Sequence, residues 1–194
     1  MIATQNETLA SLFTLLGIDN DTTNTGLELL TEAESRYLKD LKINVQNGLQ
    51  YPNLSKKESY LLALAVAANE KNAKLEEAFL RLAEQENATK AELAEIYSCV
   101  SLLNVNNVFY RFRHFTGKDY YNQTPAGIKM SVMANPVLGK EFFELVSTAV
   151  SALNGCEMCV NAHEASLVHL GTTQARIYDA VRLTAIIKGL SAIL

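Results

Sequence analysis

Two cysteines and a histidine form the most reactive combination of side chains in this sequence. They are Cys156, Cys159 and His163, with Glu144 twelve residues before the first cysteine. A Cys-x-x-Cys pair at the start of a helix can close a small disulfide ring, and the helix dipole lowers the thiol pKa. On a helix, His163 lies one turn beyond Cys159, so its imidazole can act as a base or bond to the thiolate. The pattern predicts a thiol redox centre.

A zinc site is the alternative for the same four side chains, because thiolate, imidazole and carboxylate all bind zinc. A single Cys-x-x-Cys without a second pair is a poor structural zinc site, which favours redox chemistry. Glu144 lies in the apolar segment Phe142–Val146. The alternative to a functional role is that its carboxylate lies on the solvent-exposed face of the helix and has no role in a site. Its spacing from Cys156 favours a functional role, since a buried carboxylate is costly without a task.

The remaining histidines and the third cysteine fit structural roles. His169 lies near a predicted helix end and suits a partner of the helix dipole, and His114 follows two arginines and suits packing or an interface. Cys99 resembles a small buried hydrophobic residue. The aromatic residues between Phe109 and Tyr121 could cover the thiol pocket, although core or subunit contact is the commoner use of such rings.

The composition indicates one globular unit. The chain has 194 residues, 48% hydrophobic residues and a formal net charge of −4, which favours neither disorder nor nucleic-acid binding. The first residues lack the features of a signal peptide, and no apolar run approaches the ~20 residues that span a bilayer. We expect a soluble cytoplasmic protein with no membrane partner, and in a reducing cytoplasm Cys-x-x-Cys indicates redox or metal chemistry.

The periodicity is helical almost everywhere and predicts an all-α fold. Three segments match the capping box of a helix start, Thr31–Glu34, Ser55–Glu58 and Thr89–Glu92. The predicted helices lie near residues 7–16, 30–46, 56–69, 71–86, 90–113, 125–133, 139–153, 157–169 and 173–192.

A weak internal repeat suggests the domain organisation. Ala65–Asn69 resembles Ala149–Asn154, and each segment follows a Lys-Glu pair, as a duplicated helical hairpin would produce. Chance similarity between alanine-rich helices is the alternative. We predict a one-helix N-terminal extension at 1–29 and a helical domain at 30–194. Possible half-repeats lie at about 30–88 and 89–194, and only the second carries the thiol pair.

Several longer motifs closely resemble the AhpD alkylhydroperoxidases of the carboxymuconolactone decarboxylase superfamily. The motifs are Asn107–Phe115, Met133–Pro136, Phe143–Leu145, Ala149–Cys156 and Cys159–Glu164. The resemblance extends back to Tyr37–Asn44 and covers about residues 30–194. Its spacing of carboxylate, thiols and histidine is far more specific than an isolated Cys-x-x-Cys.

The resemblance implies an all-helical homotrimer that reduces organic hydroperoxides and serves as the disulfide reductant of an AhpC-type peroxiredoxin. Electrons would come from dihydrolipoamide on a lipoyl-bearing protein, with no bound cofactor or metal. By position, Glu144, Cys156, Cys159 and His163 match the active-site carboxylate, the two thiols and the histidine of the family. The resemblance assigns attack on peroxide to Cys159 and the resolving or exchange role to Cys156.

One position departs from the family, and two other classes of function stay open. The residue before the second cysteine is often histidine in the family, and here it is Met158, which can pack but cannot shuttle a proton. Helix-dipole reasoning alone favours Cys156, expected to be the more exposed thiol, as the one that meets a partner disulfide. The alternatives are a superfamily decarboxylase, which would need no thiols, and a non-enzymatic metal-binding or regulatory module.

Overall fold

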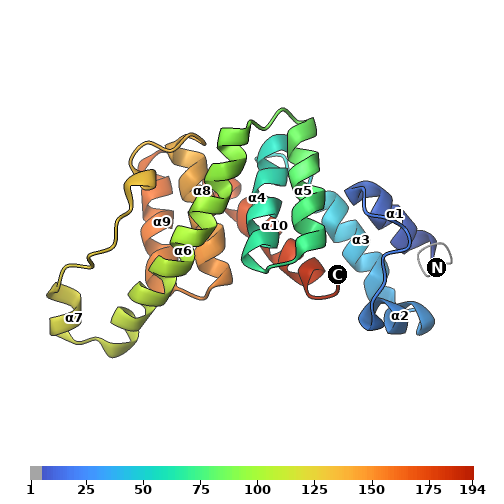
Figure 1. The fold of residues 1–194 in the computed structure, drawn as a ribbon, viewed down its shortest axis with the longest axis horizontal. Coiled ribbons are helices and arrows are strands. Elements are labelled where there is room, and N and C mark those ends of the chain that lie inside the picture. The colour runs from blue at the N-terminus through green and yellow to red at the C-terminus, as the bar shows by residue number, and fades with distance from the viewer. Residues whose placement is uncertain (1–5) are drawn as a thin grey trace.

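A computed structural model describes residues 6–194, which are helical throughout their regular structure and contain no strand (Figure 1). The predicted all-α fold class is confirmed. The elements are α1 (Glu7–Leu16), α2 (Thr25–Glu32), α3 (Arg36–Gly48), α4 (Lys56–Asn69), α5 (Ala73–Gln85), α6 (Lys90–Thr116), α7 (Asp119–Gln123), the 3-10 helix η2 (Ser131–Met133), α8 (Lys140–Leu153), α9 (Glu157–His169) and α10 (Gln174–Ser191). None of these helices is both long and apolar enough to cross a membrane.

Two buried helices, α4 and α8, form the centre of the core. They pack against each other, and α6 and α10 contact both of them. Every residue of α4 from Ser59 to Ala67 is buried, as is every residue of α8 from Phe142 to Ser151. Helix α4, buried on nearly all sides, has no strong amphipathic pattern, as expected at the centre of a helical protein. Glu144 lies within this buried stretch of α8 and therefore needs polar partners inside the protein.

Two of the three predicted capping boxes are confirmed. At the start of α4 the Ser55 amide donates to the Glu58 carboxylate at 2.8 Å, and the Glu58 amide donates to the Ser55 hydroxyl at 3.2 Å. Thr89 and Glu92 form the same reciprocal pair before α6. These bonds satisfy amides that the first helical turn leaves free, so both helices begin where the sequence predicts.

The prediction of a third capping box at Thr31–Glu34 is wrong, and so is the prediction of a single helix over residues 30–46. The structure has α2 and α3 in this region, capped at their starts by Asn24 and Ser35. Glu34 adopts a left-handed conformation with φ of 48°, and the Ser35 amide bonds to the Leu30 carbonyl at 2.9 Å. This bonding pattern ends a helix, so Thr31–Glu34 forms the end of α2 rather than the start of another helix.

The helix predicted over residues 125–133 is also wrong. Only η2 forms there, and α7, which the sequence analysis missed, precedes it. Gly117 ends α6 in a left-handed conformation with φ of 58°, which allows the chain to turn and begin α7 at Asp119. Pro125 and the left-handed Gly127, with φ of 67°, then prevent a continuous helix.

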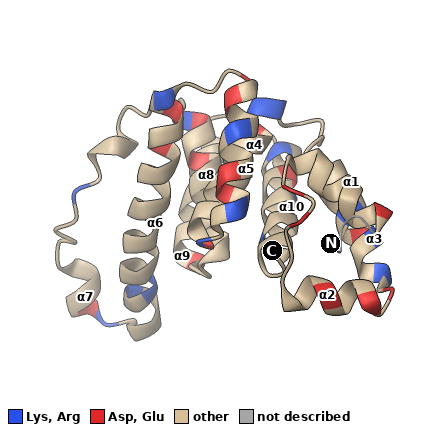
Figure 2. Ribbon diagram, turned by 45° about the vertical axis from the view of Figure 1, so that its right-hand side comes forward, with Lys and Arg blue, Asp and Glu red and all other residues tan. Residues whose placement is uncertain are grey.

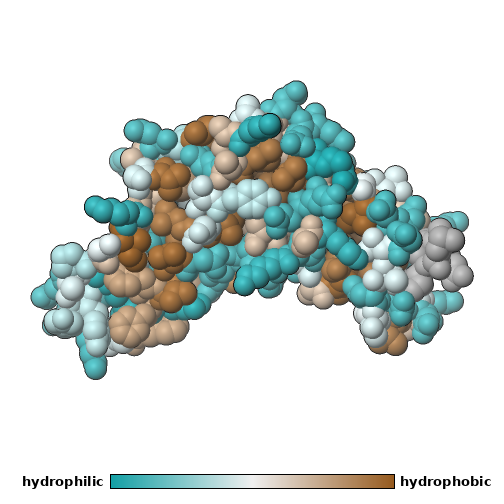
Figure 3. All heavy atoms as spheres, in the orientation of Figure 1, coloured by the Kyte–Doolittle hydropathy of each residue, from teal (hydrophilic) through white to brown (hydrophobic). Residues whose placement is uncertain are grey.

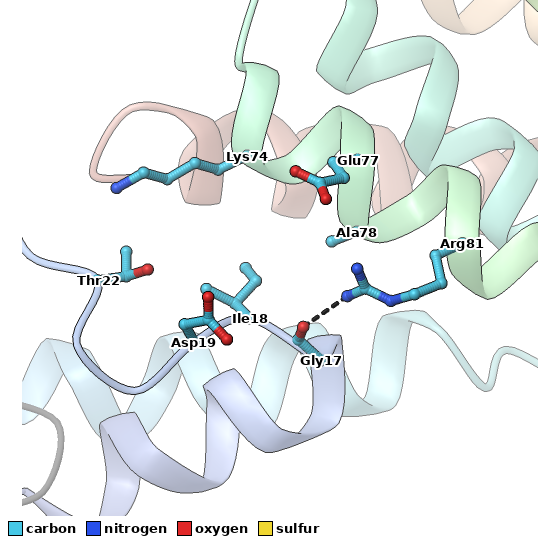
Figure 4. Close-up of a pocket in the computed structure, with 8 residues that line it drawn as sticks. All are labelled: Gly17, Ile18, Asp19, Thr22, Lys74, Glu77, Ala78 and Arg81. Carbon is cyan, nitrogen blue, oxygen red and sulfur yellow. Dashed lines mark hydrogen bonds between the residues drawn. The ribbon is translucent and has the colours of Figure 1, made fainter.

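The N-terminal helices are packed onto the rest of the protein. The predicted boundary between residues 29 and 30 falls within α2, so residues 6–29 hold α1 and the first part of a second helix. The four buried side chains of α1 join the core, and α1 contacts α3 and α5. At the end of α1, Arg81 of α5 donates to the carbonyls of Leu16 and Gly17 at 3.4 and 2.5 Å, beside a polar cavity of about 210 Å³ (Figure 4). Arg81 thereby caps α1 from a separate helix.

The α4–α5 and α8–α9 hairpins turn in the same way. In the first, Lys71 is left-handed and the Asn72 amide bonds to the Ala67 carbonyl at 3.0 Å. In the second, Gly155 is left-handed and the Cys156 amide bonds to the Ser151 carbonyl at 3.0 Å. Both are Schellman turns of three residues that lead directly into the next helix. The same three-residue turn also joins α2 to α3 through Glu34 and Ser35, so it does not distinguish a duplicated pair, and the duplication stays a prediction.

Figure 2 marks acidic and basic residues along the helices, and the two kinds alternate along α5. Arg176 of α10 bonds to two carboxylates and one backbone carbonyl. Its guanidinium binds the Glu58 carboxylate at 2.6 Å, the Glu141 carboxylate at 2.8 Å and the Asn53 carbonyl at 2.6 Å. It therefore joins α10 to α4, α8 and the loop before α4.

Replacement of Arg176 by Met will lower the free energy of unfolding by about 3 kcal/mol, because two partly buried carboxylates lose their cation. Urea denaturation at pH 7 measures this change. Burial alone would raise the pKa of Glu58, but bonds from Arg176 and Ser55 hold it below its usual value. The contribution of Glu58 is thus present at neutral pH and is lost as the pH falls through that lowered pKa.

Arg182→Met is the matched control for this prediction. Arg182 makes a single 3.4 Å ion pair with Asp179, and its own side chain is half exposed. Asp179 is buried but keeps a 2.7 Å hydrogen bond from Asn53 when Arg182 is replaced, so the control will lower stability by less than Arg176→Met does. Equal losses in the two variants would contradict the role assigned to Arg176.

Candidate active site

The α8–α9 hairpin positions the two thiols. Its Schellman turn places Cys156 at the N-cap of α9 and Cys159 in the first turn of that helix. The two residues are joined by a disulfide, with their Cα atoms 5.3 Å apart. The predicted location of the Cys-x-x-Cys pair at a helix N-terminus is therefore correct, and the pair can form the small ring that a dithiol redox centre requires.

Helix α6 holds this turn from the side. Asn107 donates to the Ser151 hydroxyl at 3.0 Å and accepts a bond from the Asn154 side chain at 2.9 Å. Arg111 donates to the Asn154 carbonyl at 2.5 Å. These bonds join the motif around Asn107 to the end of α8. The motif thus fixes the turn from which Cys156 enters α9.

The two cysteines differ in exposure, and in the opposite sense to the helix-dipole expectation. Cys156 is fully buried, with 0% of its surface exposed, whereas Cys159 is 6% exposed and borders a cavity. The turn draws Cys156 back against the end of α8 through its bond to the Ser151 carbonyl. The expectation that Cys156 is the more exposed thiol is wrong, because it considered the helix dipole without the packing of the turn.

Glu144 and His163 lie in direct contact beside the disulfide. The Oε2 atom of Glu144 is 2.6 Å from Nδ1 of His163, and their side chains are only 5% and 12% exposed. The second carboxylate oxygen, Oε1, lies 3.0 Å from Nζ of Lys140 on the preceding turn of α8. Lys140 also donates to the Met133 carbonyl at 3.0 Å. The buried carboxylate therefore has a charged or hydrogen-bonding partner on each oxygen.

This arrangement keeps Glu144 ionised. Burial alone would raise its pKa, but its bonds with His163 and Lys140 outweigh burial and hold the pKa below the usual value. An ionised carboxylate accepts, so Nδ1 of His163 carries the proton and donates it. Nε2 is then the ring nitrogen left to accept a proton. Glu144 orients the imidazole, and the imidazole is the group that can exchange protons with a substrate.

A largely apolar cavity of about 340 Å³ opens beside Cys159 and His163. Three methionines contribute much of its wall, two from the segment before α8 and one from α9. Its lining residues are Asn106, Tyr110, Met130, Met133, Met158, Cys159, Ala162 and His163. Cys156 is absent from this wall, so of the two cysteines Cys159 is the one next to a molecule in the cavity.

The other side chains considered from the sequence lie elsewhere. Cys99 is fully buried 3.6 Å from the Ser147 hydroxyl, and burial raises its pKa to about 12, which makes it inert as a nucleophile. His169 lies in the last turn of α9, where it suits the helix dipole. His114 is half exposed and 3.5 Å from the Glu157 carboxylate. None of the three lines the thiol cavity.

The aromatic residues from Phe109 to Tyr121 divide between two places. Tyr110 lines the thiol cavity, as one of the two interpretations predicts. Phe112 and Tyr121 instead meet edge to face at 5.0 Å near the end of α6. Phe115 and Tyr120 are exposed there, and Figure 3 shows apolar side chains gathered over this part of the molecule.

Sequence reasoning missed Lys140 and Asn106. Lys140 lies at i−4 from Glu144, a spacing that could have indicated an ion pair on α8. Asn106 is 5% exposed and donates to the sulfur of Met130 at 3.3 Å, a contact between distant parts of the chain with no signal in the sequence. Across residues 6–194, no cluster of three or more Cys, His, Asp or Glu side chains has the geometry to hold a metal ion.

Comparison with known proteins gives consistent matches. Residues 120–194, which include all four predicted site residues, match the carboxymuconolactone decarboxylase family. The chain is also similar over most of its length to curated proteins named alkyl hydroperoxide reductase AhpD.

Three of these relatives illustrate the range of sequence identity and coverage. The protein of Anaeromyxobacter dehalogenans (strain 2CP-C) is 37% identical over 161 residues, which cover 83% of this chain and 86% of the relative. That of Coxiella burnetii (strain Dugway 5J108-111) is 37% identical over 160 residues, covering 81% and 90%. That of Rhodopseudomonas palustris (strain BisB18) is 35% identical over 165 residues, covering 85% and 91%. Similarity of this extent reaches well beyond the Cys-x-x-Cys motif.

Proposed function

Because this chain belongs to the carboxymuconolactone decarboxylase family, as an AhpD-type member, we propose that it reduces organic hydroperoxides through a Cys156–Cys159 dithiol. The observation that carries the proposal is the position of Cys159 at an apolar cavity beside the His163–Glu144 pair. An apolar wall suits the alkyl group of an organic hydroperoxide, and the sulfur and imidazole suit its O–O bond. The names of the relatives support the same reaction.

In the proposed reaction, Nε2 of His163 takes the proton of the Cys159 thiol in the reduced protein. The thiolate attacks the distal oxygen of the hydroperoxide, the O–O bond breaks, and the alkoxide takes a proton from the imidazolium. Cys159 is left as a sulfenic acid. The thiol of Cys156 attacks its sulfur, releases water and closes the disulfide that the structure contains.

A dithiol cycle needs a reductant and a reducing compartment. We propose dihydrolipoamide on a lipoyl-bearing protein as the electron donor, an AhpC-type peroxiredoxin as the partner whose disulfide this protein reduces, and the cytoplasm as the location. The printed names of the relatives support only the reduction of alkyl hydroperoxides, and the proposed partnership with AhpC rests on the resemblance to the AhpD family. We further propose a homotrimer. The exposed apolar end of α6 and α7 provides surface that subunit contacts could bury.

The experiment that tests the proposal is consumption of cumene hydroperoxide by the pre-reduced protein with dihydrolipoamide as the only reductant. Steady consumption, with the disulfide re-formed in each cycle, is the expected result. If the thiols stay reduced in the presence of peroxide, the proposal is wrong. Zinc that survives dialysis would then favour a metal-binding module.

Lys140→Met will lower kcat/KM for this reaction about tenfold, because Glu144 loses one of the two partners that keep it ionised. The pKa of Glu144 will rise, so activity will be lost at a higher pH than in the wild type as the solution is acidified. Measurement of kcat/KM from pH 4 to 8 gives both the size of the loss and the pH at which activity falls on acidification. Lys140→Arg preserves the charge and should restore most of the activity.

Lys57→Met is the control for this prediction. Lys57 forms a 2.6 Å ion pair with Glu92 at the start of α6 and does not line the thiol cavity. Its replacement will leave the pH profile unchanged. An acid limb that shifts equally in both variants would mean that net charge, rather than contact with Glu144, is responsible.

A further inference from the structure

The distribution of methionine in this chain is unusual. The sequence has four methionines, and three of them, Met130, Met133 and Met158, line the cavity beside Cys159. They come from two separate parts of the chain, the segment that contains η2 and the first turn of α9. The wall of the cavity therefore includes three thioether side chains in addition to the side chain of Cys159.

These thioethers are the reduced sulfurs that remain at the cavity once the disulfide has formed. In the oxidised state seen here, Cys156 and Cys159 have no thiol, and Cys99 is buried away from the cavity. A thioether can reduce a hydroperoxide and become a sulfoxide, a modification that methionine sulfoxide reductases reverse. The cavity would hold an apolar hydroperoxide against these side chains until the disulfide is reduced again.

We propose that Met133 and Met158 are sites of oxygen transfer from a hydroperoxide bound in the cavity when the disulfide is closed. The thioether sulfur donates an electron pair to the distal oxygen, and the O–O bond breaks. The sulfur keeps that oxygen as a sulfoxide, and the alkoxide takes the proton that the distal oxygen carried. One hydroperoxide becomes one alcohol, and no other reductant takes part.

The three methionines should react at different rates. Met158 is 37% exposed, and no hydrogen bond is made to its sulfur or to that of Met133 in the part of the chain that the structure describes. The sulfur of Met130 accepts a 3.3 Å bond from the Asn106 amide, which withdraws electron density from it. Met130 should therefore be the slowest of the three.

Oxidation of these residues would lower the activity of the enzyme when the hydroperoxide is in excess over the reductant. A sulfoxide is polar and replaces a flexible apolar group, so the cavity would bind the alkyl part of a hydroperoxide less well. We expect KM for cumene hydroperoxide to rise after this oxidation, while the dithiol itself stays intact. This inference rests on the proposed function only in taking the cavity as the place where hydroperoxides bind.

The experiment uses the full chain in its disulfide form, with cumene hydroperoxide and no thiol reductant. Peptide mass spectrometry follows the gain of oxygen at each methionine, in the folded protein and in the same protein unfolded in urea. We expect Met158 and Met133 to react about tenfold faster in the folded protein, because the cavity concentrates the peroxide next to them. Packing alone would protect them, so slower oxidation in the folded protein would overturn the inference.

A pair of variants ties the acceleration to the cavity. Ala162→Phe fills the cavity and should abolish the faster oxidation, whereas Ala165→Phe, on an exposed position of the same helix outside the cavity, should not. Persistence of the acceleration in Ala162→Phe would also overturn the inference.

Dihydrolipoamide-dependent turnover of the same sample tests the proposed function separately. Turnover without accelerated methionine oxidation would contradict only the present inference. Accelerated oxidation without turnover would contradict only the dithiol cycle.

Discussion

Cys159→Ser is expected to abolish the proposed hydroperoxide reduction, with a loss in kcat/KM of about 1,000-fold or more, because Cys159 borders the cavity and is the proposed nucleophile. Cys156→Ser will behave differently. Its Cys159 can still attack one hydroperoxide, but no second thiol is available to close the disulfide. Each chain should then consume one equivalent of peroxide in a burst and stop.

A stopped-flow burst without added reductant measures this difference, and trapping with a sulfenic-acid reagent locates the oxidised sulfur by mass. We expect a burst and a trapped Cys159 in Cys156→Ser, and neither in Cys159→Ser. The reverse pattern would assign peroxide attack to Cys156. The structure opposes that assignment, since Cys156 is fully buried and does not reach the cavity wall.

His163→Gln will lower kcat/KM by roughly 100- to 1,000-fold near neutral pH, since in the proposed reaction the imidazole is both the base for the thiol and the acid for the leaving alkoxide. Glutamine is similar in size and can still bond to Glu144, so the loss should be chemical rather than structural. Without the base, the thiolate forms only by free ionisation. The rate of the variant should therefore rise about tenfold per pH unit until the thiol itself ionises.

The pH profile distinguishes this role from a structural one. A misfolded site would lose activity at every pH, whereas loss of a base is progressively relieved as the pH rises. Glu144→Gln is the comparison variant. It keeps the shape of the carboxylate but not its charge, and should cost less than His163→Gln because Glu144 acts by orienting the ring. Equal losses that do not depend on pH in both variants would contradict the proton-transfer role of His163.

The sequence was most predictive where local rules decide the outcome. The starts of α4 and α6 follow from Ser55 with Glu58 and from Thr89 with Glu92, because a capping box satisfies amides within four residues of each other. The same motif failed at Thr31. There Glu34 adopts a left-handed conformation that ends a helix, and such a conformation is uncommon for a residue other than glycine.

The candidate site was predictable only in part. Spacing brought Cys156, Cys159 and His163 together because all three belong to one helical segment and its cap. The contact of Glu144 with His163 depends on how α8 packs against α9. The spacing from Cys156 and the family resemblance placed Glu144 in the same site but did not predict this contact. Asn106 and the methionines before α8 reach the cavity through tertiary packing, and no periodic pattern in the sequence records that placement.

The turn that the two hairpins share indicates that the shape of the backbone does not depend on the disulfide. Lys71 and Asn72 make, without any thiol, the same backbone turn that Gly155 and Cys156 make in the second hairpin. The α8–α9 turn therefore does not need its disulfide to hold shape. Opening and closing that bond frees only a very short loop, so little chain entropy is exchanged in each cycle. We therefore expect the backbone of this turn to keep the same shape when the disulfide is reduced.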